Sequence, residues 1–300
     1  MRTLRQPGPV HPARIEAFAA APRRLTLTLP AGASLQQAVA EPLAAAGFQC
    51  ATVSFAGAAL NPFRYVMPNP SPDQAHVAWF SATQAPEGTS RIELANATFG
   101  WADAAPAIHC HAVWHEPDGA RRGGHILPAD TYLSAPAEAT AWGFRQVRIA
   151  TRADPETNFS LFQPSEFQPS EVQPPGFHPS GEPAPGTSDI PGTSGVVARV
   201  KPNQDILAAM ETVAAAHGMR DAVVRGSLGS LVGACFTDGT TVPDDATEVL
   251  VRRGFVRDGR AALDLLAVDM RGRVHEGWLA RGANPVCITF DLFLQASAGG

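Results

Sequence analysis

Three histidines, His109, His111 and His125, have the spacing of a metal site. His109 and His111 lie two residues apart, so both side chains point to one face if this segment is a β-strand. A hairpin that turns at Asp118 would place His111 directly opposite His125, with Cβ atoms roughly 5 Å apart. Three converging imidazoles suit a zinc ion and leave one coordination position for water or substrate, which is typical of reactive zinc. Histidines on a hairpin are also found simply solvated, and the spacing alone leaves that alternative open.

The residues between the histidines predict the hairpin that must position them. The stretch 116–119 reads Glu-Pro-Asp-Gly, which is a turn sequence with proline early and glycine at its end. Gly123 and Gly124 directly precede His125, and glycines inside a strand allow another backbone or a ligand to approach closely. The sequence therefore predicts one β-hairpin that carries all three histidines.

The composition sets outer limits on fold and partners. The chain has 300 residues, enough for two domains, and 45% of them are hydrophobic, so sizeable cores can form. A net charge of −5 provides no overall basic field for nucleic acid or anionic lipid. The four cysteines form no Cys-x-x-Cys pair, and no apolar run approaches the roughly 20 residues of a membrane span. We therefore expect a cytoplasmic protein with reduced, buried cysteines and no membrane segment.

The order of the expected elements predicts two similar domains joined by a linker. A strand ending in proline and a helix closed by glycine are expected over 25–30 and 35–46, and again over 196–202 and 206–216. Between them, 166–195 is rich in Pro, Gly, Ser and Thr, which favours a disordered linker. We expect an α+β fold with two copies of a mostly antiparallel β-sheet domain, each with a packed helix. The expected boundaries are 1–21 for an N-terminal extension, 22–165 for the first domain, 166–195 for the linker and 196–296 for the second domain.

The two copies differ where the chemistry is expected. Two pairs of strand segments match between them: 90–94 with 246–250, and 158–162 with 289–293. An alignment of 107–111 on 262–266 puts Asp264 and Leu266 in the places of His109 and His111, with Trp278 in the place of His125. One carboxylate cannot replace three imidazoles, so we expect the second domain to hold no metal by this geometry. Its role would then be structural, as a packing partner of the first domain, or it would bind another ligand.

This order of motifs resembles the plants-and-prokaryotes-conserved (PPC) domain. The resemblance rests on Arg-x-Glu-Leu at 91–94, His-x-His at 109–111, the Asp-Gly turn and Gly-Gly-His at 123–125. It covers about 22–165 well and 196–296 more weakly. It implies an α+β fold that commonly trimerises and is grouped with acetolactate decarboxylase, a zinc enzyme with a similar three-histidine site. By position, it implies His109, His111 and His125 as metal ligands and places Glu93 at a glutamate typical of the family. The Arg-Gly-Arg-Pro hook that accompanies the domain in plants does not occur in this sequence.

Two function classes remain open on the sequence alone. The first is a zinc-dependent enzyme, such as a lyase or hydrolase, or a metal-dependent binder of an unknown small molecule. Glu93 would then act as a general base or orient a histidine, and Arg64 and Tyr65 would bind an anionic substrate. Ordinary solvated positions are the alternative for all three side chains. The second class is a non-catalytic DNA-associated or regulatory oligomer, in which the metal only stabilises the hairpin. The acidic net charge and the missing hook argue against DNA binding, and the paired domains favour self-association.

Overall fold

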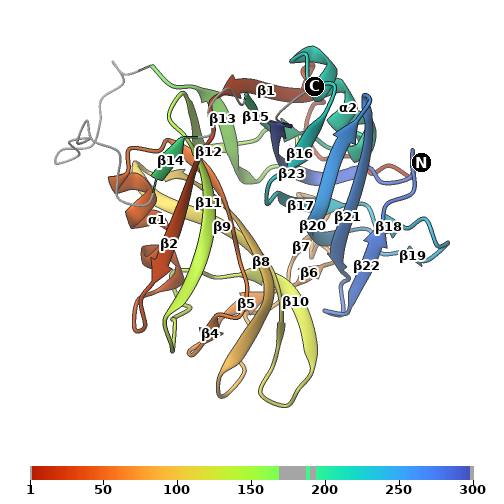
Figure 1. Ribbon diagram of the computed structural model, residues 1–300. Coiled ribbons are helices and arrows are strands. Elements are labelled where there is room, and N and C mark those ends of the chain that lie inside the picture. Colours follow the sequence, from red (N-terminus) through yellow and green to blue (C-terminus); the bar gives the residue numbers. More distant parts are fainter. Residues whose placement is uncertain (1, 169–186, 190–193, 298–300) are drawn as a thin grey trace.

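A computed structural model describes residues 2–168, 187–189 and 194–297 of this protein. These residues form two large, mostly antiparallel β-sheets, and an α-helix packs against each sheet (Figure 1). The expected α+β class with two β-sheet domains is therefore confirmed. None of the helices formed by these residues is long and apolar enough to cross a membrane.

The first sheet contains the strands that carry the three histidines. Neighbouring strands follow the order β14, β2, β11, β3, β8, β9, β10 and β5. Its main strands are β2 (Arg23–Leu29), β3 (Cys50–Phe55), β8 (Ser90–Ala102), β9 (Ala105–His115), β10 (Arg121–Ile126) and β11 (Ala137–Phe144). Its shorter or peripheral strands are β4 (Ala59–Leu60), β5 (Tyr65–Val66), β12 (Val147–Ala153), β13 (Ser160–Glu166) and β14 (Thr187–Asp189). A separate small hairpin is formed by β6 (Pro68–Asn69) and β7 (Trp79–Phe80).

Helix α1 (Leu35–Ala45) covers one face of the first sheet. Ser34 caps its first turn, because its hydroxyl accepts a hydrogen bond from the backbone N–H of Gln37 at 3.2 Å. The neighbouring strand β2 alternates in burial, so that its three leucines point into the core. Gly47 follows the helix with φ +77°, a conformation that glycine adopts at little cost. The helix expected over 35–46 is therefore present with nearly the same limits.

The second sheet repeats this construction. Helix α2 (Ile206–Ala216) is capped by Asp205, whose carboxylate accepts a hydrogen bond from the backbone N–H of Ala208. The main strands are β15 (Gly195–Val200), β16 (Ala222–Val224), β17 (Leu228–Leu231), β20 (Thr247–Arg257), β21 (Arg260–Val268), β22 (Val274–Trp278) and β23 (Val286–Ala296). A small hairpin is formed by β18 (Ala234–Cys235) and β19 (Thr241–Val242).

The two sheets share one strand order. In the first, β2, β11, β3, β8, β9 and β10 are successive neighbours, and in the second β15, β23, β16, β20, β21 and β22 follow the same sequence. The counterpart of β23 is therefore β11, and the match expected between 158–162 and 289–293 is wrong. Residues 160–162 instead belong to β13, which pairs with β12 in a hairpin at the margin of the first sheet. Apolar strand ends such as these look alike in sequence, and only the pairing distinguishes them.

The N-terminal segment crosses from one sheet to the other. Strand β1 (Ile15–Ala20) pairs antiparallel with β15 and forms an edge of the second sheet, although it precedes the whole first domain in sequence. Upstream, Gln6 donates a hydrogen bond to the backbone carbonyl of Cys287 at 2.8 Å. The region expected as a separate extension over 1–21 therefore supplies a strand of the second sheet.

Most of the linker expected over 166–195 lies outside the described residues. Within it, Thr187–Asp189 forms β14, which pairs with β2 at the edge of the first sheet.

Apolar side chains join the two sheets. One interface cluster contains Val113 from β9 together with four residues of the second sheet, Leu228, Leu250, Leu266 and Val268. A second cluster brings Cys50, Phe144, Val147 and Ile149 of the first domain against Val197 and Phe293 of the second. Burial of this apolar surface stabilises one arrangement of the two domains, and the histidine hairpin lies at their junction.

Candidate metal centre

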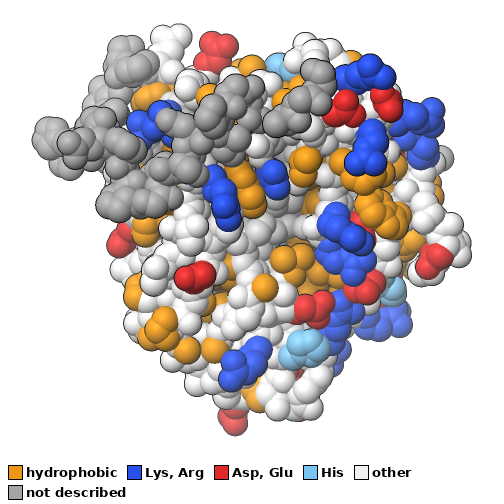
Figure 2. Space-filling view, viewed as in Figure 1, with side chains coloured by type: hydrophobic (Ala, Val, Ile, Leu, Met, Phe, Trp, Pro, Cys, Tyr) orange, Lys and Arg blue, Asp and Glu red, His pale blue; other side chains and the backbone are white. Residues whose placement is uncertain are grey.

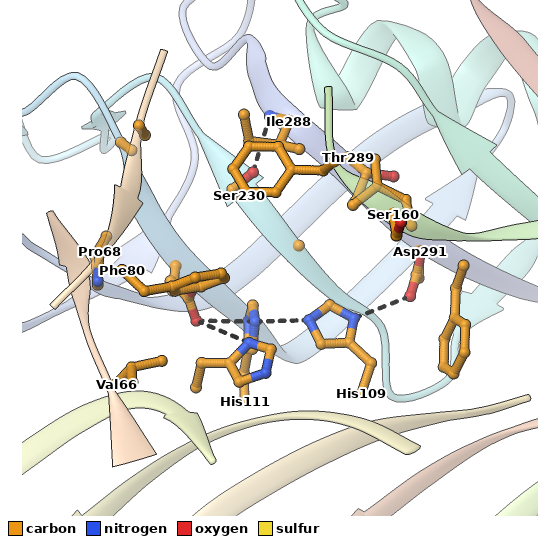
Figure 3. Close-up of a pocket in the computed structure, with 18 of the residues that line it drawn as sticks. Val66, Pro68, Phe80, His109, His111, Ser160, Ser230, Ile288, Thr289 and Asp291 are labelled. Atoms are coloured by element: carbon orange, nitrogen blue, oxygen red, sulfur yellow. Dashed lines mark hydrogen bonds and ion pairs between the residues drawn. The ribbon is translucent and has the colours of Figure 1, made fainter. Parts of the chain in front are cut away.

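His109, His111 and His125 converge at the junction of the two sheets. In the β9–β10 hairpin, His111 is directly opposite His125, which is the register predicted from the sequence. One ring nitrogen from each histidine lies within 4.8 Å of the others. The Nε2 atoms of His109 and His111 are 3.0 Å apart (Figure 3). His111 is buried, and the other two side chains are about one-fifth exposed.

Close packing around the hairpin depends on the two glycines before His125. A Cβ atom on Gly124 would lie 2.5 Å from the carbonyl oxygen of Val66 on the adjacent strand β5. A Cβ atom on Gly123 would lie 2.5 Å from a methyl carbon of Val268 in the second domain. The expected close approach at these glycines is therefore present on both sides: one glycine admits a neighbouring strand and the other admits the second domain.

A backbone carbonyl of the second domain fixes the orientation of His111. Its Nδ1 lies 3.1 Å from the carbonyl oxygen of Val249 on β20, and a carbonyl can only accept a hydrogen bond. Nδ1 must therefore carry the hydrogen, so that in the neutral ring the lone pair is on Nε2, the nitrogen that faces His109 and Glu248. This is the arrangement in which metal-bound histidines are usually held.

The second domain also directs two carboxylates at the cluster. Glu248 Oε2 on β20 lies 2.9 Å from His111 Nε2 and 4.0 Å from His125 Nδ1. Asp291 Oδ2 on β23 lies 3.5 Å from His109 Nδ1 (Figure 3). The cluster is thus a composite of both domains, with imidazoles from the first and carboxylates from the second.

Burial and the neighbouring charges shift the pKa values of His125, His111 and Glu248 in different directions. Burial lowers the pKa of His125 to about 3, so this ring is neutral at ordinary pH. Burial also opposes the charged form of His111, but the adjacent Glu248 carboxylate outweighs it and raises the pKa of His111 above its usual value. Burial similarly opposes ionisation of Glu248, yet the facing histidines hold its pKa below the usual range.

The polar atoms of the cluster fit a bound cation. His125 Nδ1, Glu248 Oε2 and Asp291 Oδ2 are buried and have no hydrogen-bond partner among the described residues. Buried polar atoms without a hydrogen bond are costly. Although the two carboxylate oxygens face His111 and His109 as ion pairs, three such atoms around one point fit a bound cation. Nitrogen donors with one or two carboxylate oxygens suit zinc among the common divalent ions. Within the described parts of the chain, no other group of three or more His, Cys, Asp or Glu side chains has this geometry.

Comparisons with known proteins add structural neighbours at low identity. The sequence matches no family model and no curated protein. Among solved structures, a plant- and prokaryote-conserved (PPC) protein from Pyrococcus horikoshii is 14% identical, with a TM-score of 0.41, and the match covers 50% of this chain and 97% of that one. A metal-containing protein from Archaeoglobus fulgidus is 18% identical, with a TM-score of 0.38, over 47% of this chain and 92% of that one. A proposed DNA-binding protein from Ralstonia eutropha is 15% identical, with a TM-score of 0.35, over 46% and 89%.

A cavity of about 490 Å³ opens beside the three histidines. It lies between the domains, since β9, β10 and β13 of the first and β17, β20 and β23 of the second all contribute to its lining. Volumes of roughly 300–1,000 Å³ are typical of small-molecule sites. The cavity brings a ligand-sized space into contact with the imidazoles and with both carboxylates.

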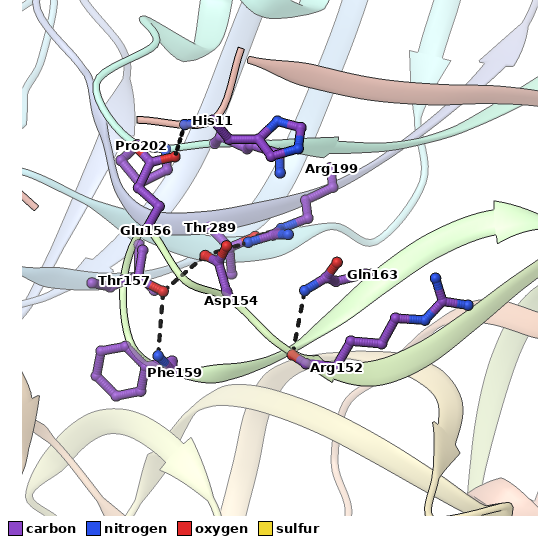
Figure 4. A network of polar contacts seen from close by, with 12 residues as sticks. His11, Arg152, Asp154, Glu156, Thr157, Phe159, Gln163, Arg199, Pro202 and Thr289 are labelled. Atoms are coloured by element: carbon purple, nitrogen blue, oxygen red, sulfur yellow. Dashed lines mark hydrogen bonds and ion pairs between the residues drawn. The ribbon is translucent and has the colours of Figure 1, made fainter. Parts of the chain in front are cut away.

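A buried polar network holds one wall of this cavity in place (Figure 4). Arg199 of β15 donates a hydrogen bond to Asp154 Oδ2 at 2.9 Å and another to the hydroxyl of Thr289 at 3.2 Å. Asp154 also accepts a hydrogen bond from the hydroxyl of Thr157 at 2.8 Å. This loop leads directly into Phe159, which lines the cavity. A cation of the second domain therefore orders the loop of the first domain that forms the wall.

The other site residues expected from the sequence lie elsewhere. Glu93 forms a bidentate ion pair with Arg121, at 2.7 and 2.8 Å, and does not line the cavity. Tyr65 is buried in the core, where its hydroxyl donates a hydrogen bond to Glu116 at 2.7 Å. Arg64 is half-buried on the segment before β5 and is also absent from the cavity lining. The structure thus brings together the three histidines and separates them from these three residues.

The second domain carries an ion-pair cluster in the corresponding hairpin. Asp264 is opposite Trp278, as His111 is opposite His125, and Gly277 before the tryptophan has φ +148°, close to the +155° of Gly124. This register puts Asp264 in the place of His111, so the placement under His109 expected from the sequence is two residues off. The Asp264 carboxylate is buried and binds the guanidinium groups of Arg252 at 2.7 Å and Arg253 at 3.1 Å.

Glu248 and Asp291 are site residues that sequence reasoning did not find. Glu248 belongs to the segment that was matched with 90–94, and Asp291 to the segment that closes the second copy. The one available signal was a carboxylate within a run of buried strand residues, since such a charge needs a partner. The partner itself lies in the other domain, so nothing near either residue in the sequence identifies it.

Proposed function

We propose that this protein is a metal-dependent enzyme or binder of a small molecule, with a zinc ion held by His109, His111 and His125. One observation carries the proposal: three ring nitrogens converge beside a ligand-sized cavity, and the Val249 carbonyl fixes His111 in the tautomer that offers Nε2. Glu248 would complete the donor set or face a ligand from the opposite domain. Asp291 would orient His109 through Nδ1.

The side chains around the cluster suit hydrolysis or lyase chemistry. When bound, zinc would polarise a carbonyl group or activate a water molecule. Glu248 Oε2 is the carboxylate oxygen nearest to His111 Nε2 and is positioned to accept a proton from a group bound there. We therefore assign the role of general base to Glu248 in preference to Glu93, whose carboxylate is occupied by Arg121 outside the cavity.

We further propose that the chain is a tandem duplication related to PPC proteins. The motif order of the first domain and the shared strand order of both sheets support this. The second domain would have lost its histidines and kept the packing role that a separate subunit has in a trimer-forming relative. The chain would then self-associate with further copies through surfaces that the two domains do not bury against each other.

Metal analysis of the purified protein tests the main proposal. We expect about one zinc per chain in the wild type and a large loss of bound zinc in His111→Ala. His115→Ala is the matched control, because His115 lies on the same strand but is half-exposed and paired with Glu93. Wild-type protein without stoichiometric metal, or equal metal in wild type and His111→Ala, would contradict the proposal.

DNA association is the second candidate, and one surface favours it. Arginines gather over β20–β22 on the second domain (Figure 2), where Arg253 stacks on Trp278 and Arg257 on Phe255. Arg253 also binds Asp264, so part of the positive charge on this face is neutralised. We therefore expect no sub-micromolar binding of duplex DNA at about 150 mM salt, and a titration with a steep salt dependence would favour this candidate.

A further inference from the structure

The cavity beside the metal centre has an aromatic wall that the metal chemistry does not require. Phe80 contacts the His125 ring edge-on at a centroid distance of 5.3 Å, and Phe162 lies 6.5 Å from the His109 ring. Phe159 stacks against Trp79 at 5.4 Å. These four aromatic side chains all line the cavity, so a ligand held at the histidines would lie among ring faces and edges.

Two of these aromatic residues are exposed to solvent at the cavity. Trp79 is 39% exposed and Phe80 is 37% exposed, and together they form the short strand β7. Large exposed aromatic side chains next to a pocket are typical of surfaces that a ligand covers. Both belong to the first domain, whereas Ile288 supplies apolar surface from the second.

The charges of the lining limit the ligand further. The described lining contains no lysine or arginine, and its only acidic residues are Glu248 and Asp291, which face the histidines. Two carboxylates would balance the charge of a divalent metal ion. A further anionic group on the ligand would therefore meet carboxylates and aromatic surface with no cation to pair it, and burial of an unpaired charge is costly.

We propose that the cavity binds an aromatic compound that carries one metal-binding oxygen group and no further anionic group. The inference rests on the proposed metal centre and specifies the class of its ligand. The oxygen group would reach the metal at His109, His111 and His125, and the ring would lie against Phe80 and Phe159. This assignment differs from the anionic substrate expected from Arg64 and Tyr65, neither of which lines the cavity.

A hydroxamate series tests this ligand class on the zinc-loaded full-length protein. Acetohydroxamic acid and benzohydroxamic acid share the metal-binding group and differ in the ring, and the 4-carboxy derivative of the latter adds a negative charge. Isothermal titration should show benzohydroxamic acid binding at least about tenfold more tightly than the aceto compound, because a buried ring removes much more apolar surface from water. The 4-carboxy derivative should lose about tenfold or more relative to the uncharged ring, because the lining has no cation to pair with its carboxylate.

Two variants test whether the aromatic side chains of the cavity cause the preference for benzohydroxamic acid. Phe80→Ala and Phe159→Ala should each weaken benzohydroxamic acid by roughly three- to tenfold while leaving acetohydroxamic acid unchanged. Phe80→Leu keeps apolar bulk and serves where the alanine variant folds poorly. Phe255→Ala is the control, since Phe255 packs on Trp278 in the second sheet and does not line the cavity.

The outcomes separate the two proposals. Stoichiometric zinc together with equal affinity for aceto- and benzohydroxamic acid, or with tighter binding of the 4-carboxy derivative, would overturn the ligand class and leave the metal centre intact. Protein that holds no zinc would overturn both, because the ligand is bound through its oxygen on the metal.

Discussion

Glu248 of the second domain lies 2.9 Å from Nε2 of His111 in the first. The next residue, Val249, accepts the hydrogen bond from the other nitrogen of the same ring. Two adjacent positions of β20 therefore act on both sides of one imidazole. The orientation of the candidate metal centre depends on how the second domain docks against the first.

Glu248→Gln should weaken zinc binding without removing the three imidazoles. Loss of a carboxylate that contacts or orients metal ligands typically costs about 10–100-fold in metal affinity, and we expect a change in that range. Competition with a chromophoric chelator measures it. Glu276→Gln is the control, because Glu276 is a partly exposed acid of β22 that binds Arg121 and does not line the cavity. Equal zinc affinity in wild type and Glu248→Gln would show that Glu248 does not act on the metal.

Leu250→Ala tests whether metal binding depends on the interface between the domains. Leu250 is buried in the cluster that joins Val113 to the second sheet, and truncation of a buried leucine costs about 2–5 kcal/mol. Because Leu250 shares β20 with Glu248, we expect both a lower melting temperature and weaker zinc retention. Leu207→Ala, on the buried face of α2, should lower stability comparably while retaining zinc. A variant at Leu250 that is destabilised but binds zinc normally would contradict this coupling.

Loss of the two arginines that bind the buried Asp264 should destabilise the protein more than loss of the Asp264 charge. Arg252→Ala combined with Arg253→Ala leaves a fully buried carboxylate without its arginines, which costs about 3–5 kcal/mol for broken buried pairs. Asp264→Asn leaves two arginines that are partly exposed and can be hydrated, so we expect a smaller loss of about 1–3 kcal/mol. Urea unfolding gives both free energies. Arg220→Ala, at an exposed pair with Asp258, should change little, and a larger loss in Asp264→Asn than in the double variant would be inconsistent with this view.

Glu93 should contribute pH-dependent stability. Its hydrogen bonds from Arg121 lower the pKa of the Glu93 carboxyl below its usual 4.5 in the folded protein. The ionised form is therefore favoured by folding, so this contribution is present above about pH 4.5 and is lost as the pH falls through the lower folded pKa.

The variant Glu93→Gln isolates this contribution. Because the pair is one-third exposed, we expect a loss of up to about 1 kcal/mol at pH 7 that disappears on acidification. Thermal unfolding measured from pH 7 to pH 3 should show the wild-type and variant curves converging. Glu41→Gln, at an exposed position of α1, should run parallel to the wild type throughout. A gap between wild type and Glu93→Gln that stays constant with pH would rule out the ion pair as its source.

Short-range sequence patterns were sufficient to predict the local part of the site. The two-residue spacing of His109 and His111 places both on one face of a strand, and the Glu-Pro-Asp-Gly turn sets the register that brings His125 opposite His111. The same kind of pattern located both helices and most of the long strands, because periodicity and capping act over a few neighbouring residues.

The surroundings of the histidines, in contrast, depend on contacts between distant parts of the chain. The hydrogen bond from His111 to Val249 joins residues 138 positions apart, and Glu248, Asp291 and the aromatic wall reach the cluster from other strands and the other domain. Strand β1 likewise joins the second sheet across the whole first domain. Apolar burial drives such docking without a directional signal in the sequence, so which faces meet depends on the complementarity of complete surfaces. For the same reason, Glu93, Arg64 and Tyr65 were reasonable expectations from sequence position, yet the folded chain turns them away from the cavity.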